Sequence, residues 1–211
     1  MARQNRVTPA GEVIATPERG TMLGNRGVLH DDQGRIKRAW QLKRWIVCVL
    51  QFKGRRRAVM TPGRYTELFF LDEATALAAG HRPCAECRRE RFNAFRHAWL
   101  SGNPGIIGSQ KPTAILIDEC LHAERLAADR ARRLFPANLN ELPNGVFLRG
   151  KEWGETPYLL WNDALFAWSP GRYGERRPRP RNEEVLVLTP KSTVGAIQAG
   201  YVPEVHPSAN D

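Results

Sequence analysis

Hydrophobic positions in the first 70 residues fall into short runs of strand length. Strands are predicted at GEVIAT (11–16), RWIVCVLQF (44–52) and TELFF (66–70), where β-branched, aromatic and other apolar residues concentrate between turn-forming residues. The Lys-Gly pair at 53–54 indicates a turn, so RRAVM (56–60) is predicted to be the return arm of a hairpin.

The spacing of apolar residues changes to a helical one after residue 71. Asp72 is a typical helix-capping residue and Gly80 suits a left-handed stop, which predicts a short helix between them. Pro83 is predicted to open a second helix that runs to about Leu100. Three aromatic residues spaced three and four apart predict its buried face: Phe92, Phe95 and Trp99.

A Gly- and Pro-rich break at 101–112 separates these helices from the rest of the chain. The interior of the next segment, 118–134, favours helix, whereas TAILI (113–117) fits either a strand or the start of that helix. Further on, strand-like runs alternate with turn residues, the Pro- and Arg-rich stretch 171–182 is predicted to be a loop, and a short helix is predicted at 191–199. The runs are GVFLRG (145–150), TPYLLW (156–161), ALFAWS (164–169) and EVLVLTP (184–190).

Together these elements predict an α+β fold. A mixed N-terminal domain is expected over residues 1–105, and a helix followed by a small β subdomain over 113–211.

Charge is distributed unevenly along the 211 residues. The chain carries 32 Lys and Arg against 22 Asp and Glu, and residues 1–64 hold 14 of the basic and 4 of the acidic side chains, so the whole excess of 10 lies there. Within 35–57 the basic residues are interleaved with Trp40 and Trp45, a mixture that suits phosphate contacts and base stacking, although a solvated basic hairpin would look the same. The predicted nucleic-acid-binding residues are Lys43, Arg44, Lys53, Arg55, Arg56 and Arg57.

The apolar runs also bear on the compartment of the protein. The longest, WIVCVL and TAILI, are far shorter than the roughly 20 residues of a membrane-spanning helix, and the N-terminal residues lack a secretion-signal pattern. We therefore expect a cytoplasmic protein, in which four cysteines serve as thiols or metal ligands and not as a disulfide framework.

Cys84 and Cys87 form the single Cys-x-x-Cys pair, and two thiols at this spacing can both face one metal ion. The sequence around them is FFLDEATALAAGHRPCAECRR (69–89). It contains an aromatic pair, a Glu- and Ala-rich segment predicted to be a helix, a glycine and then Arg-Pro-Cys-x-x-Cys. In this order of elements it resembles the second half of the Ada-type metal-binding module of methylphosphotriester-DNA repair proteins. The resemblance implies a zinc site and a role in DNA repair or modification.

The chain departs from the Ada pattern upstream, where the family has a second pair of ligands and this sequence has GRRRAVMTPGRYTEL (54–68). Cys48, on a predicted strand, is the expected third ligand. The methyl-accepting cysteine of the family belongs to the missing pair, so only Cys48 could replace it, and we expect a structural clamp without alkyl uptake. The candidates for a fourth ligand are His30, His81, Cys120 and His122, and the alternatives to a metal site are idle reduced thiols or a redox pair.

Two other polar clusters are candidate sites. His30, Asp31 and Asp32 could bind a hard metal ion or activate water but also fit an ordinary turn, and His122-Ala-Glu124-Arg125 fits a salt-bridged helix face. The leading hypothesis is a zinc-stabilised nucleic-acid-binding protein, with DNA the expected partner. The alternatives are a metal-dependent nuclease or alkyl-acceptor enzyme, and a module that binds an acidic protein.

Overall fold

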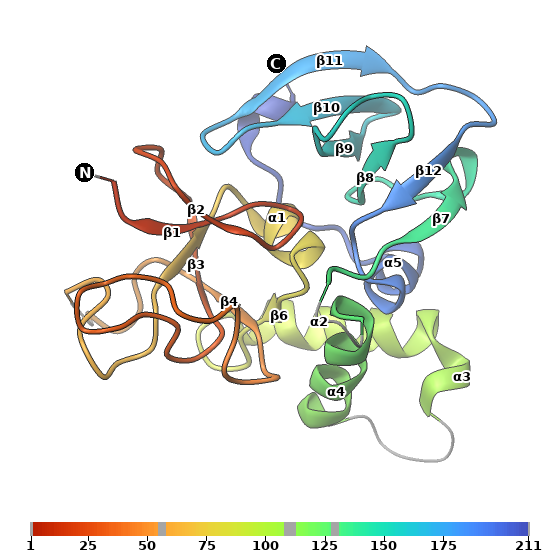
Figure 1. Cartoon of the computed structure of the whole chain (residues 1–211). Coiled ribbons are helices and arrows are strands. Elements are labelled where there is room, and N and C mark those ends of the chain that lie inside the picture. Colours follow the sequence, from red (N-terminus) through yellow and green to blue (C-terminus); the bar gives the residue numbers. More distant parts are fainter. Residues whose placement is uncertain (1, 55–57, 108–112, 128–130, 211) are drawn as a thin grey trace.

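The computed structural model describes residues 2–54, 58–107, 113–127 and 131–210. Two six-stranded sheets lie on either side of a short helix, and most of the remaining helices gather below them (Figure 1). The α+β class predicted from the sequence is confirmed.

The first sheet is built from the N-terminal residues, in the strand order β2-β1-β5-β3-β4-β6. All its neighbours are antiparallel except β1 with β5 and β4 with β6. The predicted strands at 11–16, 44–52 and 66–70 are present in shorter form, whereas residues 58–60 of the predicted return arm form no strand. The strands are β1 (Gln4–Val7), β2 (Val13–Ala15), β3 (Met22–Asn25), β4 (Ile46–Cys48), β5 (Leu68–Phe70) and β6 (Arg82–Pro83).

The two faces of this sheet differ in burial because successive residues of a strand point to opposite sides. Val7, Val47, Leu68 and Phe70 are almost fully buried in a core that includes residues of helix α1 (Glu73–Ala78). The register places the partly exposed row Arg6, Phe69, Leu23 and Cys48 on the other side. We call this second side the open face.

Helix α1 lies between the sheets and every one of its residues is buried. Asp72 caps its N-terminus by accepting the Thr75 N–H at 2.8 Å, and Gly80 follows with a φ of +88°, so both predicted ends are confirmed. Ala76 belongs to the core of the first sheet, while Ala74 and Ala78 belong to a core shared with the second. The helix therefore contributes to the packing of both sheets.

The second predicted helix starts later than expected. Arg82 and Cys84 donate their backbone N–H groups to the carbonyl oxygens of Trp45 and Val47 in and beside strand β4, so Arg82–Pro83 forms β6 and residues 85–88 form turns. Sheet pairing thus prevails over the helix-opening tendency of Pro83, and helix α2 spans Arg89–Gly102. The predicted burial of Phe92, Phe95 and Trp99 on this helix is confirmed.

The remaining helices are α3 (Pro104–Ile107), α4 (Ala114–Arg125) and α5 (Lys191–Gln198), with 3-10 turns at Leu139–Glu141 and Pro207–Ala209. Thr113 caps α4 by accepting the Leu116 N–H, so the ambiguous TAILI segment is the beginning of a helix. In the described part of the chain no helix combines the length and the apolar character needed to cross a membrane.

The second sheet has the order β11-β10-β9-β8-β12-β7, and all its described pairings are antiparallel. Residues 171–182, predicted to be a loop, contain strand β11. The prediction was wrong because β11 is an edge strand, where Pro178 can end the pairing without a missing ladder bond in the middle of a sheet. The strands are β7 (Phe135–Asn138), β8 (Phe147–Gly150), β9 (Tyr158–Trp161), β10 (Ala164–Trp168), β11 (Tyr173–Pro178) and β12 (Glu184–Val187).

Candidate metal centre and the open sheet face

Three cysteines from two separate parts of the sequence meet at the edge of the first sheet. Cys48 ends β4, and Cys84 directly follows β6. The parallel register Val47 to Pro83 brings these two residues to the same level, and the Cys84 N–H donates to Val47 O at 2.9 Å. The turn after Cys84, closed by the Arg88 N–H donating to Cys84 O at 3.1 Å, returns Cys87 to the same place.

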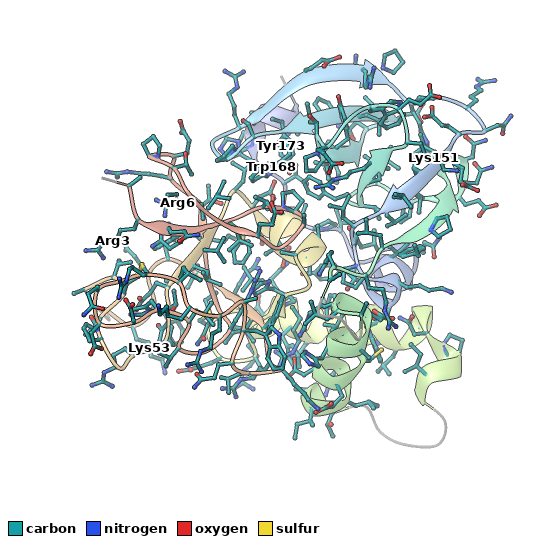
Figure 2. The ribbon with its side chains drawn as sticks, in the orientation of Figure 1. Arg3, Arg6, Lys53, Lys151, Trp168 and Tyr173 are labelled. Carbon is teal, nitrogen blue, oxygen red and sulfur yellow. The ribbon has the colours of Figure 1, made fainter. Side chains whose placement is uncertain are left out.

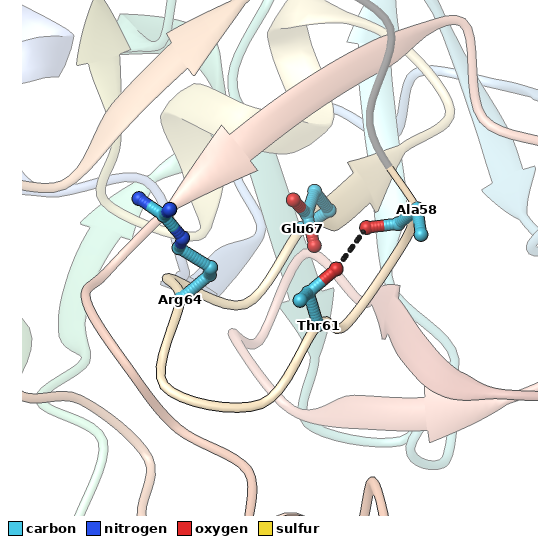
Figure 3. A pocket seen from close by; sticks show the side chains of 4 residues that line it. All are labelled: Ala58, Thr61, Arg64 and Glu67. Carbon is cyan, nitrogen blue, oxygen red and sulfur yellow. Dashed lines mark hydrogen bonds between the residues drawn. The ribbon is translucent and has the colours of Figure 1, made fainter.

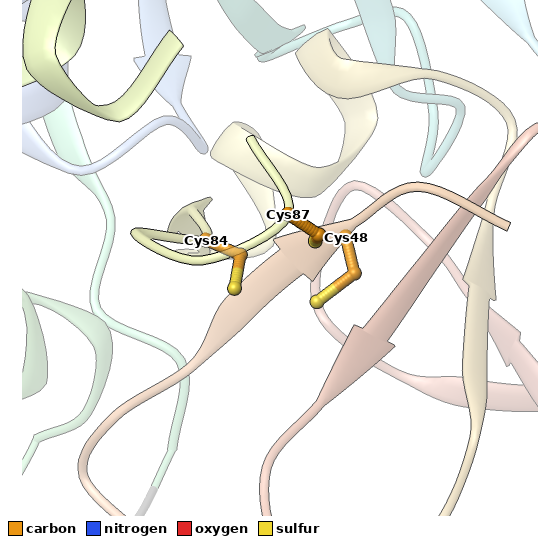
Figure 4. A group of neighbouring side chains, drawn as sticks. All are labelled: Cys48, Cys84 and Cys87. Atoms are coloured by element: carbon orange, nitrogen blue, oxygen red, sulfur yellow. The ribbon is translucent and has the colours of Figure 1, made fainter. Parts of the chain in front are cut away.

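The sulfur atoms of Cys48, Cys84 and Cys87 all lie within 4.8 Å of one another (Figure 4). A tetrahedral zinc ion with Zn–S bonds of about 2.3 Å needs sulfurs about 3.8 Å apart, so small side-chain rotations suffice to bind one. The Glu86 N–H donates to Cys84 Sγ at 3.4 Å. An N–H donor aimed at a sulfur stabilises thiolate, the form that binds metal, so the donor set fits a metal ion.

The pKa values of the three thiols differ although the residues are neighbours. A hydrogen bond from Cys48 holds the pKa of Cys84 down at about 5, against the effect of burial, and the backbone N–H groups of Cys87 and Glu86 add to this. The same hydrogen bond, with burial, raises the pKa of Cys48, and burial raises that of Cys87. Cys84 is therefore the first of the three to carry negative charge.

None of the four candidates for a fourth ligand joins the three sulfurs. His30 Nδ1 lies 2.6 Å from Thr66 Oγ1, and His81 is buried between Trp45 and Phe70, where its Nε2 accepts from Arg26. On α4, Cys120 contacts Glu124 and His122 packs against the ring of Trp40. Among the described residues the three sulfurs therefore form a group that could hold a metal ion, and none of the four candidates supplies a fourth ligand.

Comparison of the chain with protein-family models, with curated proteins and with solved structures finds no significant match.

The His30-Asp31-Asp32 cluster is a turn and not a site. Asp31 accepts the backbone N–H groups of Gln33 and Arg35 and pairs with the Arg35 guanidinium at 2.8 Å, while His30 points to Thr66. Of the cysteine, histidine and carboxylate groups that the structure describes, only the three cysteines cluster closely enough to hold an ion.

The polar side chains of His122, Glu124 and Arg125 on α4 do not form a site either. Glu124 accepts the backbone N–H and the hydroxyl of Ser192 at the start of α5, and Arg125 is fully buried and donates to Gly80 O and Lys43 O. These side chains hold helices and loops together and do not converge on a common point.

Three adjoining hollows cover the open face. The metal-side hollow, about 590 Å³, is lined by all three cysteines and by Leu23, Asn25, Arg44, Ile46, Phe52, Glu67 and Phe69 among others. The loop-side hollow, about 470 Å³, lies between Ala58, Thr61, Arg64 and Glu67 (Figure 3). The terminal hollow, about 480 Å³, includes Arg3, Arg6, Ala58, Val59 and Phe69. The three hollows adjoin one another because they share lining residues. Glu67 lines both the metal-side and the loop-side hollow, and Ala58 lines both the loop-side and the terminal hollow. Val59 and Phe69 line both the metal-side and the terminal hollow.

The predicted nucleic-acid-binding residues fall into three groups. Arg44 lines the metal-side hollow, and Lys53 lies over the ring of Phe52, which lines it too. Lys43 instead pairs with Glu119 of α4 at 2.6 Å. Arg55, Arg56 and Arg57 lie outside the described residues.

Sequence reasoning missed three further arginines that line the hollows, Arg3, Arg6 and Arg64 (Figure 2 labels the first two). Arg6 lies over the ring of Phe69 at 4.9 Å, across the β1–β5 pair. The charge excess of residues 1–64 was the available signal, but only the sheet pairing brings these side chains to one face.

Proposed function

We propose that the protein binds nucleic acid, with DNA the expected form, along the open face of its first sheet, and that a zinc ion held by Cys48, Cys84 and Cys87 stabilises this face. The observation that carries the proposal is the group of three adjoining hollows edged by Arg3, Arg6, Arg44 and Arg64. Guanidinium groups gathered on one face can contact a phosphate backbone.

Aromatic side chains on the same face support the proposal. Phe69 stands on the sheet, and Phe52 and Tyr65 approach from the segment that follows β4. Nucleic-acid-binding sheets combine basic side chains with aromatic rings on which bases stack. Solubility alone would require the charged side chains of this face but not its aromatic rings.

The zinc ion has a structural task in this proposal. It ties the end of β4 to the turn after β6 and so holds one edge of the open face in place. The Ada-like sequence of residues 69–89 supports a role in DNA repair or modification, because it includes both the aromatic pair and the two cysteines of the turn.

The test compares two double variants with the same change of charge. Arg44→Glu with Arg64→Glu alters the hollows, and the control, Arg176→Glu with Arg181→Glu, alters exposed positions on and after β11. Fluorescence anisotropy with a labelled DNA duplex is measured over a series of salt concentrations. We expect the first variant to lower the slope of log K against log salt by about 2, and the control to leave it near the wild-type value. Equal slopes for all three proteins would refute the proposal.

A second candidate function, alkyl acceptance, is favoured by the position of Cys48. Its sulfur belongs to the ligand cluster and lines the metal-side hollow, where a bound DNA phosphate could reach it. Intact-mass measurement after incubation with methylphosphotriester DNA decides between a clamp and an acceptor. One added methyl group that disappears in Cys48→Ala would establish an alkyl acceptor, and an unchanged mass would exclude it.

A further inference from the structure

The metal-side hollow has the dimensions and walls of a ligand pocket and not merely of a groove. Its volume of about 590 Å³ lies within the usual range for small-molecule sites. Leu23, Ile46 and Phe69 form an apolar floor on the sheet, and Phe52 faces the same space from the following segment. Such walls suit a flat aromatic ligand.

The polar groups of this hollow are suited to the edge of a heterocycle. Asn25 Oδ1 accepts the Gly27 N–H at 2.7 Å, so its amide nitrogen is the group left to donate. Glu67 is buried, and its Oε2 accepts the Met60 N–H at 2.7 Å, which fixes the carboxylate, and no group of the described residues donates to Oε1. A donor and an acceptor on apolar walls are what a nucleobase edge requires.

The metal centre forms one wall of the same hollow. All three cysteines line it, and the described residues supply no fourth ligand. Zinc takes nitrogen and oxygen ligands alongside thiolates, and ring nitrogens and carbonyl oxygens of bases are ligands of these kinds.

We propose that the metal-side hollow takes up one unpaired nucleobase and places its edge at the open coordination position of the metal. This inference rests on the proposed function, because the adjoining arginine-edged hollows hold the phosphates next to that base. The base comes either from a single strand or from an unpaired nucleotide within a duplex. A fully paired duplex cannot offer it without breaking a pair, at a cost of a few kcal/mol.

The experiment uses the full-length protein loaded with Co²⁺, whose visible bands report its coordination. Four DNA probes of equal length are titrated: a paired duplex, a duplex with one bulged 2-aminopurine, the same duplex with a bulged abasic site, and a single strand with one 2-aminopurine. The bulge sets the register, and the abasic bulge keeps the flexibility and charge of the DNA while removing the base.

We expect the bulged base and the single strand to bind about tenfold more tightly than the paired and abasic duplexes. Binding of these two probes should also change the 2-aminopurine emission and shift the Co²⁺ bands. Phe69→Leu should abolish the preference while keeping an apolar floor, whereas Trp168→Leu on the second sheet should leave it intact. Tighter binding of the bulge than of the single strand would identify duplex DNA as the source of the base, and the reverse would identify single strands.

The outcomes that overturn the inference are separable from failure of the proposed function. Salt-dependent binding with equal affinity for the base and abasic bulges, or a Co²⁺ shift that is as large with the abasic probe, would refute the base pocket and leave nucleic-acid binding standing. No affinity for any probe at low salt would refute both.

Discussion

At the scale of single residues, three of the four cysteines form the candidate metal site, and the fourth, Cys120, lies elsewhere. Cys84 is nearly buried and receives an N–H donor, whereas Cys48 and Cys87 are partly exposed toward the metal-side hollow. Cys120 is on α4, beside Glu124, and burial raises its pKa to about 11. Cys120 is partly buried and lies outside the group of three sulfurs, so it is not expected to bind the metal.

Serine variants of the cysteines test this distinction. We expect about one zinc per wild-type chain and its loss in Cys84→Ser with Cys87→Ser, because a single remaining thiolate cannot hold the ion. Cys48→Ser should weaken binding, and Cys120→Ser is the matched control that should keep full metal content. Elemental analysis of the purified proteins gives the stoichiometry. Unchanged zinc in the double variant would exclude this site.

At the scale of elements, helix α1 is stabilised at its N-terminus by a fully buried carboxylate. Asp72 accepts the N–H and hydroxyl of Thr75, the hydroxyl of Tyr173 and the N–H of His206. Burial nevertheless raises the pKa of Asp72, because loss of hydration outweighs these four hydrogen bonds. The folded protein therefore takes up this proton at a higher pH than the unfolded chain does.

The sign of the resulting pH dependence can be measured. Between the ordinary pKa of aspartate and the raised value in the folded state, the folded state holds more protons, so the contribution of Asp72 to the free energy of unfolding falls as pH rises. In urea titrations over this range, the stability of wild type relative to Asp72→Asn should decrease with pH.

Asp31→Asn is the control of opposite sign. Hydrogen bonds led by the Arg35 N–H lower the pKa of Asp31, so between this lowered value and the ordinary pKa of aspartate the stability of wild type relative to this variant should rise with pH. A relative stability of wild type over Asp72→Asn that rises with pH would contradict the assignment.

At the scale of the whole molecule, the C-terminal segment returns to the start of α1. Glu73 is fully buried and accepts from Arg88, from the Tyr201 hydroxyl at 2.6 Å and from the Glu204 N–H at 2.9 Å. Arg88 directly follows Cys87, so the turn that carries Cys84 and Cys87, α1 and the C-terminal segment share one buried network. Because α1 also packs into the cores of both sheets, we expect the two halves of the chain to unfold together.

Removal of zinc tests this coupling. A ligand that binds only the folded state stabilises it by about 4 kcal/mol at a thousand times its Kd, so chelation should lower the urea midpoint of the whole chain. Hydrogen exchange followed by mass spectrometry should show faster exchange in β8, β9 and β10 as well as in the first sheet. Chelation that loosens residues 1–105 alone, with β8 to β10 still protected, would show that the halves are independent.

Local signals in the sequence were enough for the fold class, the capped helix from Asp72 to Gly80 and the buried face of α2. These features depend on spacing and capping over a few residues, which the order of residues records directly. The start of α2, strand β11 and the separation of the four fourth-ligand candidates were decided by tertiary structure, since each depends on which segment lies alongside. The same is true of the open face. Arg6, Leu23, Cys48 and Phe69 become neighbours only when four strands distant in sequence pair in one register, because that register determines which side chains face solvent.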